Sequence, residues 1–370
     1  MTFPSLQLPR PAFDAVYKCL DVAEIISLSQ CSHTMRRIVS NQESARYGRR
    51  IKVTVNRTSC LVAVGKPDSE VHGGFKGFTW SLCSIRDYQL ADVREFIDRK
   101  IDGVIWKVGR IRNGWVSVPD QGCMEKDLLT LLNMFKSIFH CPIYQISLDF
   151  GELDFGKLLR ETDALHQAEN ITVMSTRLDH DEADFLFDKL ITDNLVFGGY
   201  AGKEYVYQKP LNFPKIEISC AAWVNYEKLM EMVITCKSVD LESAKQISDK
   251  ELNQFIKNWM GSDKRSLETV KIVRDQHHSM RNSRQNAPVA QFQRPVIMEG
   301  IRASQGCKKR SDAAEYYKDN VNYQNGLDIC RQDGVWATVL VEQESYRGAF
   351  IFTVWYDENP HLMEEEAVEN

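Results

Sequence analysis

Between residues 141 and 273 the chain repeats one pattern, in which a short β-rich segment returns after each stretch of about 25 residues. The segments are centred on Ile146, Val173, Val196, Glu217, Asp240 and Lys271. A period of this length is typical of solenoid proteins, in which each repeat is one supersecondary unit. Because no single unit can bury its apolar face alone, neighbouring units must stack. This requirement constrains the fold more than any other feature of the sequence.

Helical patterns lie between several of these segments, at residues 181–191, 225–234 and 248–260. One strand and one helix per unit resembles a leucine-rich repeat, in a degenerate form that lacks the strict Leu and Asn ladder of that family. We therefore expect an α+β or α/β fold with a leucine-rich-repeat-like body over residues 141–273. A non-repetitive α/β domain is the alternative.

The first forty residues predict three short helices. An apolar stripe with i, i+3, i+4, i+7 spacing marks the first: Phe13, Val16, Tyr17 and Leu20. Asp21 with Glu24 has the form of a capping box for the second helix, and Ser32 can cap the third. The group is either the corner of a larger helical domain or a separate module at residues 3–42.

The order of residue types in this module resembles the F-box. The matching features are Leu8-Pro9, Val16, Leu20, Glu24-Ile25-Ile26, Leu28-Ser29, Cys31-Ser32, Met35-Arg36 and Val39. F-boxes dock on the Skp-type adaptor of cullin–RING ubiquitin ligases, so the resemblance implies a Skp-type adaptor and, through it, a cullin as partners. The residues it assigns to that interface are Leu8, Pro9, Val16, Leu20, Ile25, Ile26 and Leu28. Arg10-Pro11 stands where many F-boxes carry an acidic residue, which keeps open whether this module binds an adaptor.

Residues 43–140 predict a mixed β and helical linking region. Residues 51–64 alternate and are rich in Val, as in a strand or hairpin. An amphipathic helix is expected over residues 125–139, and its apolar side consists of Leu128, Leu131, Leu132 and Phe135.

The C-terminal part of the chain begins with a predicted basic, flexible insert at residues 274–325. Eight basic residues between positions 274 and 310 are opposed only by Asp275 and Glu299. Such a segment either engages an acidic partner or is a solvated loop, which is the reading we favour. Two alternating segments around residues 344–348 predict a β-hairpin at 326–357, followed by an acidic tail at 358–370.

This second half also resembles the F-box-associated region of the large nematode F-box family. One motif consists of Asp249, Lys250, Glu251, Leu252, Asn253, Phe255 and Trp259. A closing motif consists of Asp328, Ile329, Arg331, Asp333, Gly334, Ala337, Thr338, Val339, Phe352, Val354 and Trp355. The resemblance implies a subunit that recruits a substrate rather than a catalyst.

We find no catalytic or cofactor-binding motif in the sequence that predicts an active site. His180, Asp181 and Asp184 could suggest a metal, but no second His converges on them. Residues 198–204 miss the spacing of a phosphate-binding loop. We therefore expect no enzyme, no metal and no cofactor.

Composition narrows the partners and the compartment that we expect. The formal net charge of −5 gives no basic field for nucleic acid. No apolar run reaches the roughly 18 residues of a membrane span, and no signal peptide is recognisable. Ten cysteines without a Cys-x-x-Cys pair argue against a zinc ribbon. We expect an intracellular protein in the cytoplasm, the nucleus or both.

The sequence therefore predicts the substrate-recognition adaptor of an SCF-type ubiquitin ligase. The alternative is a stand-alone protein-interaction or sequestering module that does not engage a ligase. An unknown protein substrate would bind the C-terminal region, and the candidate contact residues there are Trp336, Phe352, Trp355 and Tyr356.

Overall fold

The computed structural model describes residues 9–42, 49–68, 74–83, 93, 95–101, 104–111, 114–118, 124–149, 156–160, 162–174, 178–263, 266–275, 291–305, 321, 323–343 and 347–356. The chain divides into two compact units. Unit 1 comprises Met1–Ser175 and Leu190–Thr192, and unit 2 comprises Thr176–Lys189 and Asp193–Asn370.

Unit 1 begins with three helices, α1 (Arg10–Cys19), α2 (Val22–Gln30) and α3 (His33–Ser40). The predicted capping box is present, because the Asp21 side chain accepts from the Glu24 amide while the Glu24 carboxylate accepts from the Asp21 amide. The Ser32 hydroxyl accepts from the amide of Met35 and starts α3. These caps confirm the three helices predicted from the sequence.

A sheet follows in unit 1. Its strands are β1 (Arg50–Val55), β2 (Ser59–Asp68), β3 (Gly74–Cys83), β4 (Phe96–Ile101), β5 (Val104–Ile111), β6 (Gly114–Ser117), β7 (Ile143–Leu148) and β8 (Asn170–Val173). Their order in space is β8-β7-β1-β2-β3-β6-β5-β4. The pairs β1–β7, β7–β8 and β3–β6 are parallel, and the others are antiparallel. A Cβ on Gly65 would collide with the backbone of Lys76 and Gly77, so the β2–β3 pair needs glycine there.

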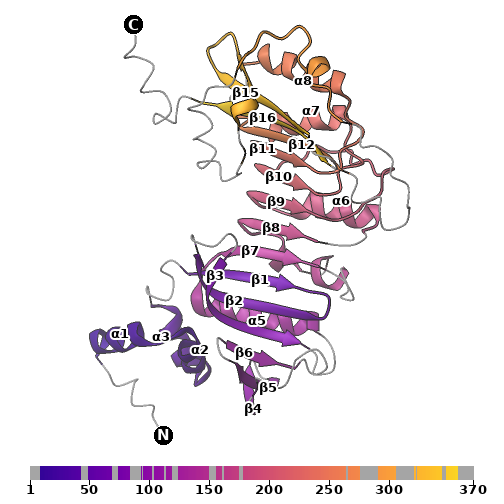
Figure 1. Cartoon of the computed structure of the whole chain (residues 1–370). Helices are drawn as coiled ribbons and strands as arrows, with labels where there is room; N and C mark the ends of the chain where they lie inside the picture. The colour runs from indigo at the N-terminus through magenta and orange to yellow at the C-terminus, as the bar shows by residue number, and fades with distance from the viewer. Residues whose placement is uncertain are drawn as a thin grey trace. The chain divides into compact units, whose positions relative to one another are not determined.

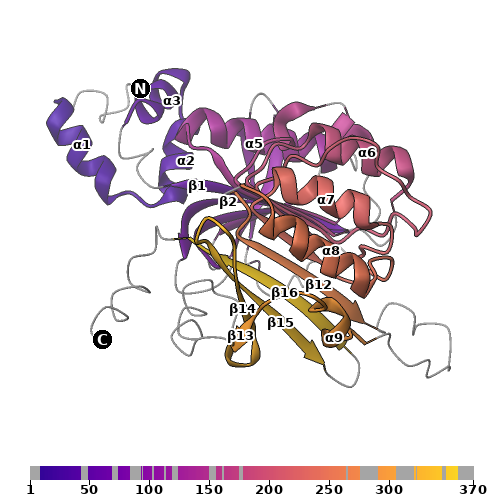
Figure 2. The same cartoon turned by 90° about the horizontal axis from the view of Figure 1, so that it is seen from above.

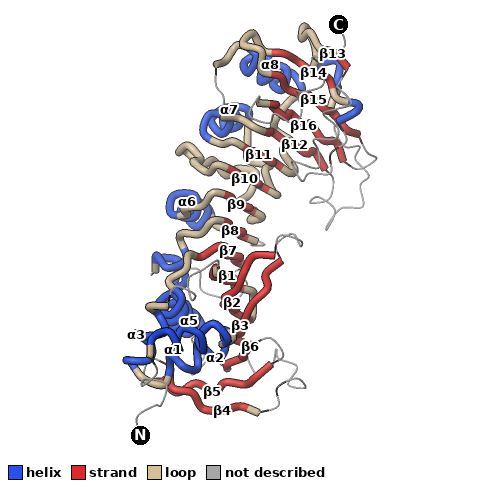
Figure 3. The backbone as a smooth tube through the Cα atoms, turned by 90° about the vertical axis from the view of Figure 1, so that its left-hand side faces the viewer, coloured by secondary structure: helices blue, strands red, loops and turns tan. Residues whose placement is uncertain are grey.

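Helix α5 (Met124–Phe139) packs against strands β2 and β3 of this sheet (Figure 3). Its four predicted apolar positions, Leu128, Leu131, Leu132 and Phe135, are all fully buried. The Phe135 ring lies 6.2 Å from that of Trp80, which in turn lies 4.8 Å from Trp115. Short helical turns at Gly156–Arg160 and Asp163–Leu165 complete the described helical segments of unit 1.

Unit 2 begins with three helices and four parallel strands, and a segment without helix joins the first two strands. The elements in chain order are α6 (His180–Lys189), β9 (Asn194–Phe197), β10 (Lys215–Ile218), α7 (Tyr226–Thr235), β11 (Ser238–Leu241), α8 (Asp249–Met260) and β12 (Thr269–Asp275). Strands β9 to β12 pair in parallel and in chain order. Helices α6, α7 and α8 lie on one side of these strands (Figure 1). The residues that face the helices are buried, and the alternate residues are not.

Antiparallel strands extend the unit 2 sheet beyond β12. They are β13 (Ser304–Gln305), β14 (Leu327–Cys330), β15 (Trp336–Gln343) and β16 (Arg347–Trp355), arranged as β12-β16-β15-β14-β13. Helix α9 (Arg294–Ile297) and the turn Tyr323–Asn325 lie in the segments between β12 and β14. Figure 2 shows α7 and α8 over one face of the β12–β16 region.

All six predicted repeat segments are strands, although the division into units differs from the prediction. Strands β7 and β8 belong to unit 1 and β9 to β12 to unit 2, so residues 141–273 are not one compact body. The leucine-rich-repeat-like classification stays a prediction. The predicted hairpin is present as β15 and β16, and β14 adds a strand that the sequence pattern did not reveal. Its turn at residues 344–346 and the acidic tail lie outside the described residues.

The predicted flexible insert at 274–325 is wrong for the part that the structure describes. Arg274 lies in β12 and is buried. Asp249 pairs with its guanidinium at 2.9 Å and compensates the buried charge. Phe292 and Ile297 are also buried, and the Asn253 side chain donates to the carbonyl of Ile297 at 2.8 Å. Residues 276–290, 306–320 and 322 lie outside the described part. None of the described helices is both long and apolar enough to span a membrane.

Candidate functional site

The N-terminal helices expose only part of the predicted adaptor interface. Val16 is 49% exposed and Pro9 is exposed, whereas Leu20 and Leu28 are half-buried. Ile25 and Ile26 are fully buried, as are the neighbouring core residues Tyr17, Met35 and Val39. The two isoleucines therefore belong to the core of the helical module, and their assignment to an adaptor interface stays a prediction. Leu8 lies outside the described residues.

Arg99 of β4 holds α2 against the body of unit 1. Its Nη1 donates to the Ser27 hydroxyl at 3.2 Å and to the Gln30 amide oxygen at 3.3 Å. The guanidinium lies 4.0 Å from the centroid of the Trp115 ring, in a cation–π contact. Because the Arg99 guanidinium is partly shielded from water, its pKa is lowered from the usual value. The three helices are thus attached to the sheet of unit 1.

The second candidate surface is the open face of β9 to β12 in unit 2. Val196, Glu217, Asp240 and Lys271 lie directly beside one another on successive strands, and all four are half-buried. Their neighbours along the strands point to the helix-covered face and are buried. We call these four side chains the open row.

Charged side chains on this face are unevenly paired. Lys271 Nζ donates to Asp240 Oδ2 at 2.6 Å, and Arg347 of β16 pairs with Glu242 at 3.2 Å. Glu217 has no hydrogen-bond or ion-pair partner among the described residues, and Asp240 Oδ1 is buried without one. Burial raises the pKa of Glu217, and the carboxylates of Asp240 and Glu242 raise it further.

The predicted aromatic contact residues are mostly interior. Phe352 is fully buried, with its ring 5.0 Å from Phe255 and 5.1 Å from Trp259 of α8. Trp355 is 8% exposed, and its indole N–H donates to the Thr338 hydroxyl at 2.8 Å. These two residues are core residues, which corrects the prediction.

The other two aromatic candidates, Trp336 and Tyr356, are half-buried. Trp336 packs against a small core that includes Tyr323 and Ile351. The Tyr356 hydroxyl donates to the Leu267 carbonyl at 2.8 Å. Both side chains are engaged within unit 2, so the four aromatics do not form an exposed binding surface.

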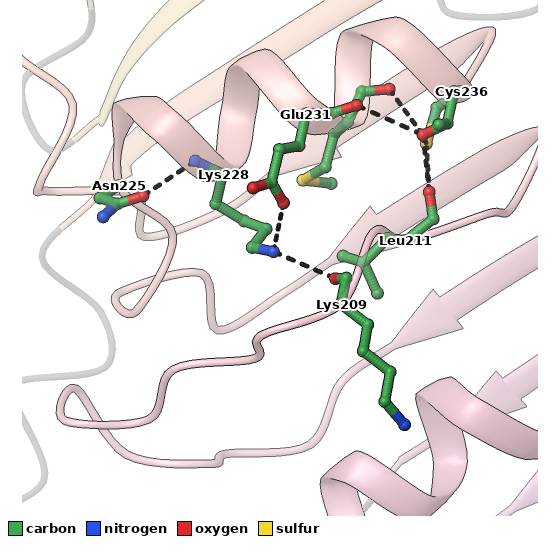
Figure 4. Close-up of polar contacts among 8 residues, drawn as sticks. Lys209, Leu211, Asn225, Lys228, Glu231 and Cys236 are labelled. Atoms are coloured by element: carbon green, nitrogen blue, oxygen red, sulfur yellow. Dashed lines mark hydrogen bonds and ion pairs between the residues drawn. The ribbon is translucent and has the colours of Figure 1, made fainter.

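On the helix-covered side, a polar network fastens the segment before β10 to α7 (Figure 4). Lys228 is 8% exposed, and its Nζ donates to the Lys209 carbonyl at 3.1 Å and to Glu231 at 2.5 Å. Thr235 donates to the Leu211 carbonyl at 2.7 Å. Lys228 therefore has a structural role, because the network holds α7 against the segment that leads into β10.

The acidic start of α6 is also structural. Asp179 and Glu182 form a reciprocal capping pair, and Asp184 accepts from the Tyr205 hydroxyl at 2.6 Å. Within the described residues, no three His, Cys, Asp or Glu side chains are grouped as metal ligands.

One segment of unit 2 is similar to a known protein family. Residues 207–272 match a protein-family model described as F-box associated, and this segment includes β10, α7, β11, α8 and the start of β12. This segment is therefore similar to F-box-associated domains, which is the resemblance that the sequence indicated for the second half of the chain. The F-box assignment of residues 3–42 stays a prediction.

Two relatives come from Caenorhabditis elegans. The chain is 22% identical to the uncharacterized protein F59B2.9 over 390 residues, which cover 100% of this chain and 82% of the relative. It is 25% identical to the uncharacterized protein F59B2.8 over 162 residues, which cover 42% of this chain and 34% of the relative. No solved structure matches the chain.

Glu217, Asp240 and Lys271 mark the centres of three repeat segments in the sequence, and their position on one surface was not predicted. The signal was present, because a polar residue at the same position of successive repeats must lie in one row when parallel strands pair in register. Arg99 carried no comparable signal, since its partners in α2 are distant in the sequence.

Proposed function

We propose that this chain is the substrate-recognition subunit of an SCF-type ubiquitin ligase. The observation that carries the proposal is the match of residues 207–272 to the F-box-associated family model, in a chain whose N-terminal part forms three helices with a residue order that resembles the F-box. In this arrangement α1 to α3 bind a Skp-type adaptor, and through it a cullin. The open face of unit 2 holds a protein substrate. The chain contributes proximity, and other subunits of the ligase perform the covalent chemistry.

Direct binding of the full chain to a purified Skp-type adaptor, measured by isothermal titration calorimetry, tests this function. Val16→Asp is the informative variant, because the side chain is 49% exposed and its replacement leaves the buried Ile25 and Ile26 in place. We expect the wild type to bind and Val16→Asp to lose at least about tenfold in affinity, since a charge would enter an apolar contact.

Ile105→Asp is the matched control. Ile105 is 64% exposed on β5 of the same unit, so the variant makes the same chemical change outside the helical module. Its affinity should equal that of the wild type. If the wild type shows no binding at tens of micromolar adaptor, the ligase role fails and the sequestering module becomes the leading function.

A further inference from the structure

Strand β4 is the last strand of the unit 1 sheet (Figure 3). Within the part of the chain that the structure describes, its backbone pairs only with β5. Every second residue on the outer side of such a strand directs its backbone N–H and C=O groups away from the sheet. This edge can therefore accept one more strand.

The solvent side of β4 carries two charges of opposite sign. Asp98 and Lys100 are two residues apart, so they lie on the same face of the sheet, and both are exposed. Neither side chain has an ion-pair or hydrogen-bond partner among the described residues. An edge with charges of one sign would repel a second copy of itself, whereas this pair is complementary to itself when the strand direction is reversed.

We infer that β4 pairs with β4 of a second copy in an antiparallel, twofold-symmetric dimer. In such a dimer residue i contacts residue j of the other copy, and j contacts i. The register centred on Arg99 places Asp98 opposite Lys100 of the second copy, and the symmetry repeats this attraction. Among registers that keep each face of the sheet continuous, those centred on Asp98 or Lys100 place like charges opposite each other. The charges therefore select one register.

The other face of β4 is compatible with the same register. Ile97 is 45% exposed in the single chain, and the register places it beside Ile101 of the second copy, which covers part of its apolar surface. The two Arg99 residues lie opposite each other, but each guanidinium reaches back over Trp115 of β6, two strands away from the edge. The dimer involves unit 1 alone and does not depend on adaptor binding.

Sedimentation velocity of the full chain, at concentrations from about 1 to about 100 micromolar, tests the inference. We expect the average mass of the wild type to rise toward that of a dimer across this range. Lys100→Asp and Asp98→Lys each turn both attractions into repulsions, so each should weaken dimerisation at least about tenfold. Both side chains are exposed, so neither substitution disturbs the core.

An equimolar mixture of these two variants is the decisive sample. One carries two lysines on this face of β4 and the other carries two aspartates, so a mixed dimer regains both attractions. We expect the mixture to associate within about threefold of the wild-type affinity, although neither variant does so alone. The double variant Asp98→Lys/Lys100→Asp, which exchanges the charges within one chain, should dimerise like the wild type. A role for these charges within a single chain would not produce this complementation.

Lys66→Asp is the matched control, because Lys66 is exposed on β2, which lies inside the sheet between β1 and β3. It makes the same change of charge away from the edge and should leave dimerisation unchanged. The inference is overturned if the wild type stays monomeric at about 100 micromolar or if the mixed variants fail to associate. A loss with Lys66→Asp equal to that with Lys100→Asp would overturn it as well.

Discussion

Glu217 lies between two buried isoleucines, Ile216 and Ile218, yet its own side chain is on the open face of the sheet. The strand's twofold alternation produces this difference, because successive side chains point to opposite faces. The isoleucines stabilise the core, whereas the carboxylate, placed beside Asp240, costs stability in the free chain. A residue that is unfavourable for folding and half-exposed is a good candidate for recognition.

Replacing Glu217 by Gln should stabilise the free protein at neutral pH. The pKa of Glu217 is higher in the folded state than in the unfolded state. As the pH rises, the unfolded chain therefore ionises first, and the free energy of unfolding falls until the pH has passed the folded-state pKa. The variant removes this penalty, and we expect a gain of a few tenths to about 1 kcal/mol. Below about pH 3 the Glu217 carboxyl is protonated in both states of the wild type, since the ordinary Glu pKa is about 4.3, and the difference should vanish.

Urea unfolding of both proteins at neutral and acidic pH measures the effect of this substitution. Glu204→Gln is the control, because the Glu204 side chain is 79% exposed, and its stability relative to the wild type should not change with pH in this way. A Glu217→Gln protein that is less stable than the wild type at neutral pH would show that the carboxylate has a favourable partner.

Helix α2 illustrates how an element is fixed by contacts that its own sequence does not contain. The capping box at Asp21 starts the helix, but Arg99, far along the chain, attaches it to the sheet through Ser27 and Gln30. Ser27 and Gln30, two polar residues of this helix, thus attach it to the sheet.

Arg99→Met should loosen α2 without unfolding unit 1. Each lost hydrogen bond to a charged donor is worth about 1–3 kcal/mol, so the amides of α2 should exchange with solvent at least about tenfold faster. Hydrogen exchange detected by mass spectrometry measures this effect. Lys100→Met removes a neighbouring, exposed charge and should leave α2 exchange unchanged; equal acceleration in both variants would contradict the role of Arg99.

Elements with local signals were predictable from the sequence, and long-range pairings were not. Caps at Asp21 and Ser32 and the spacing of the repeat strands gave the right helices and strands, since both depend on near neighbours. The pairing of β12 with β16 joins Thr269 to Thr353, and no local pattern specifies it. Arg274 was read as part of a solvated basic segment because its partner, Asp249, lies on another element.

At the scale of the whole molecule, the proposed adaptor and substrate surfaces belong to different compact units. Val16 lies in unit 1, and the open row lies in unit 2. Substitutions at one surface should therefore leave the other unchanged, because effects at independent sites that share no contacts are additive.

The double variant Val16→Asp/Glu217→Gln tests this independence. Its loss of adaptor affinity should equal that of Val16→Asp within about twofold, and its gain in stability over Val16→Asp should equal the gain of Glu217→Gln over the wild type. Calorimetry and urea unfolding on one preparation provide both numbers. A larger loss or a different gain would reveal coupling between the units.

The register of β9 to β12 also has a consequence for how such a protein diversifies. One substitution on a strand changes the chemistry of the open row while the buried residues on either side stay in place. New binding preferences can therefore accumulate one codon at a time, with little loss of foldability at each step. A lineage built on this arrangement can keep its scaffold while the residues of the open row change.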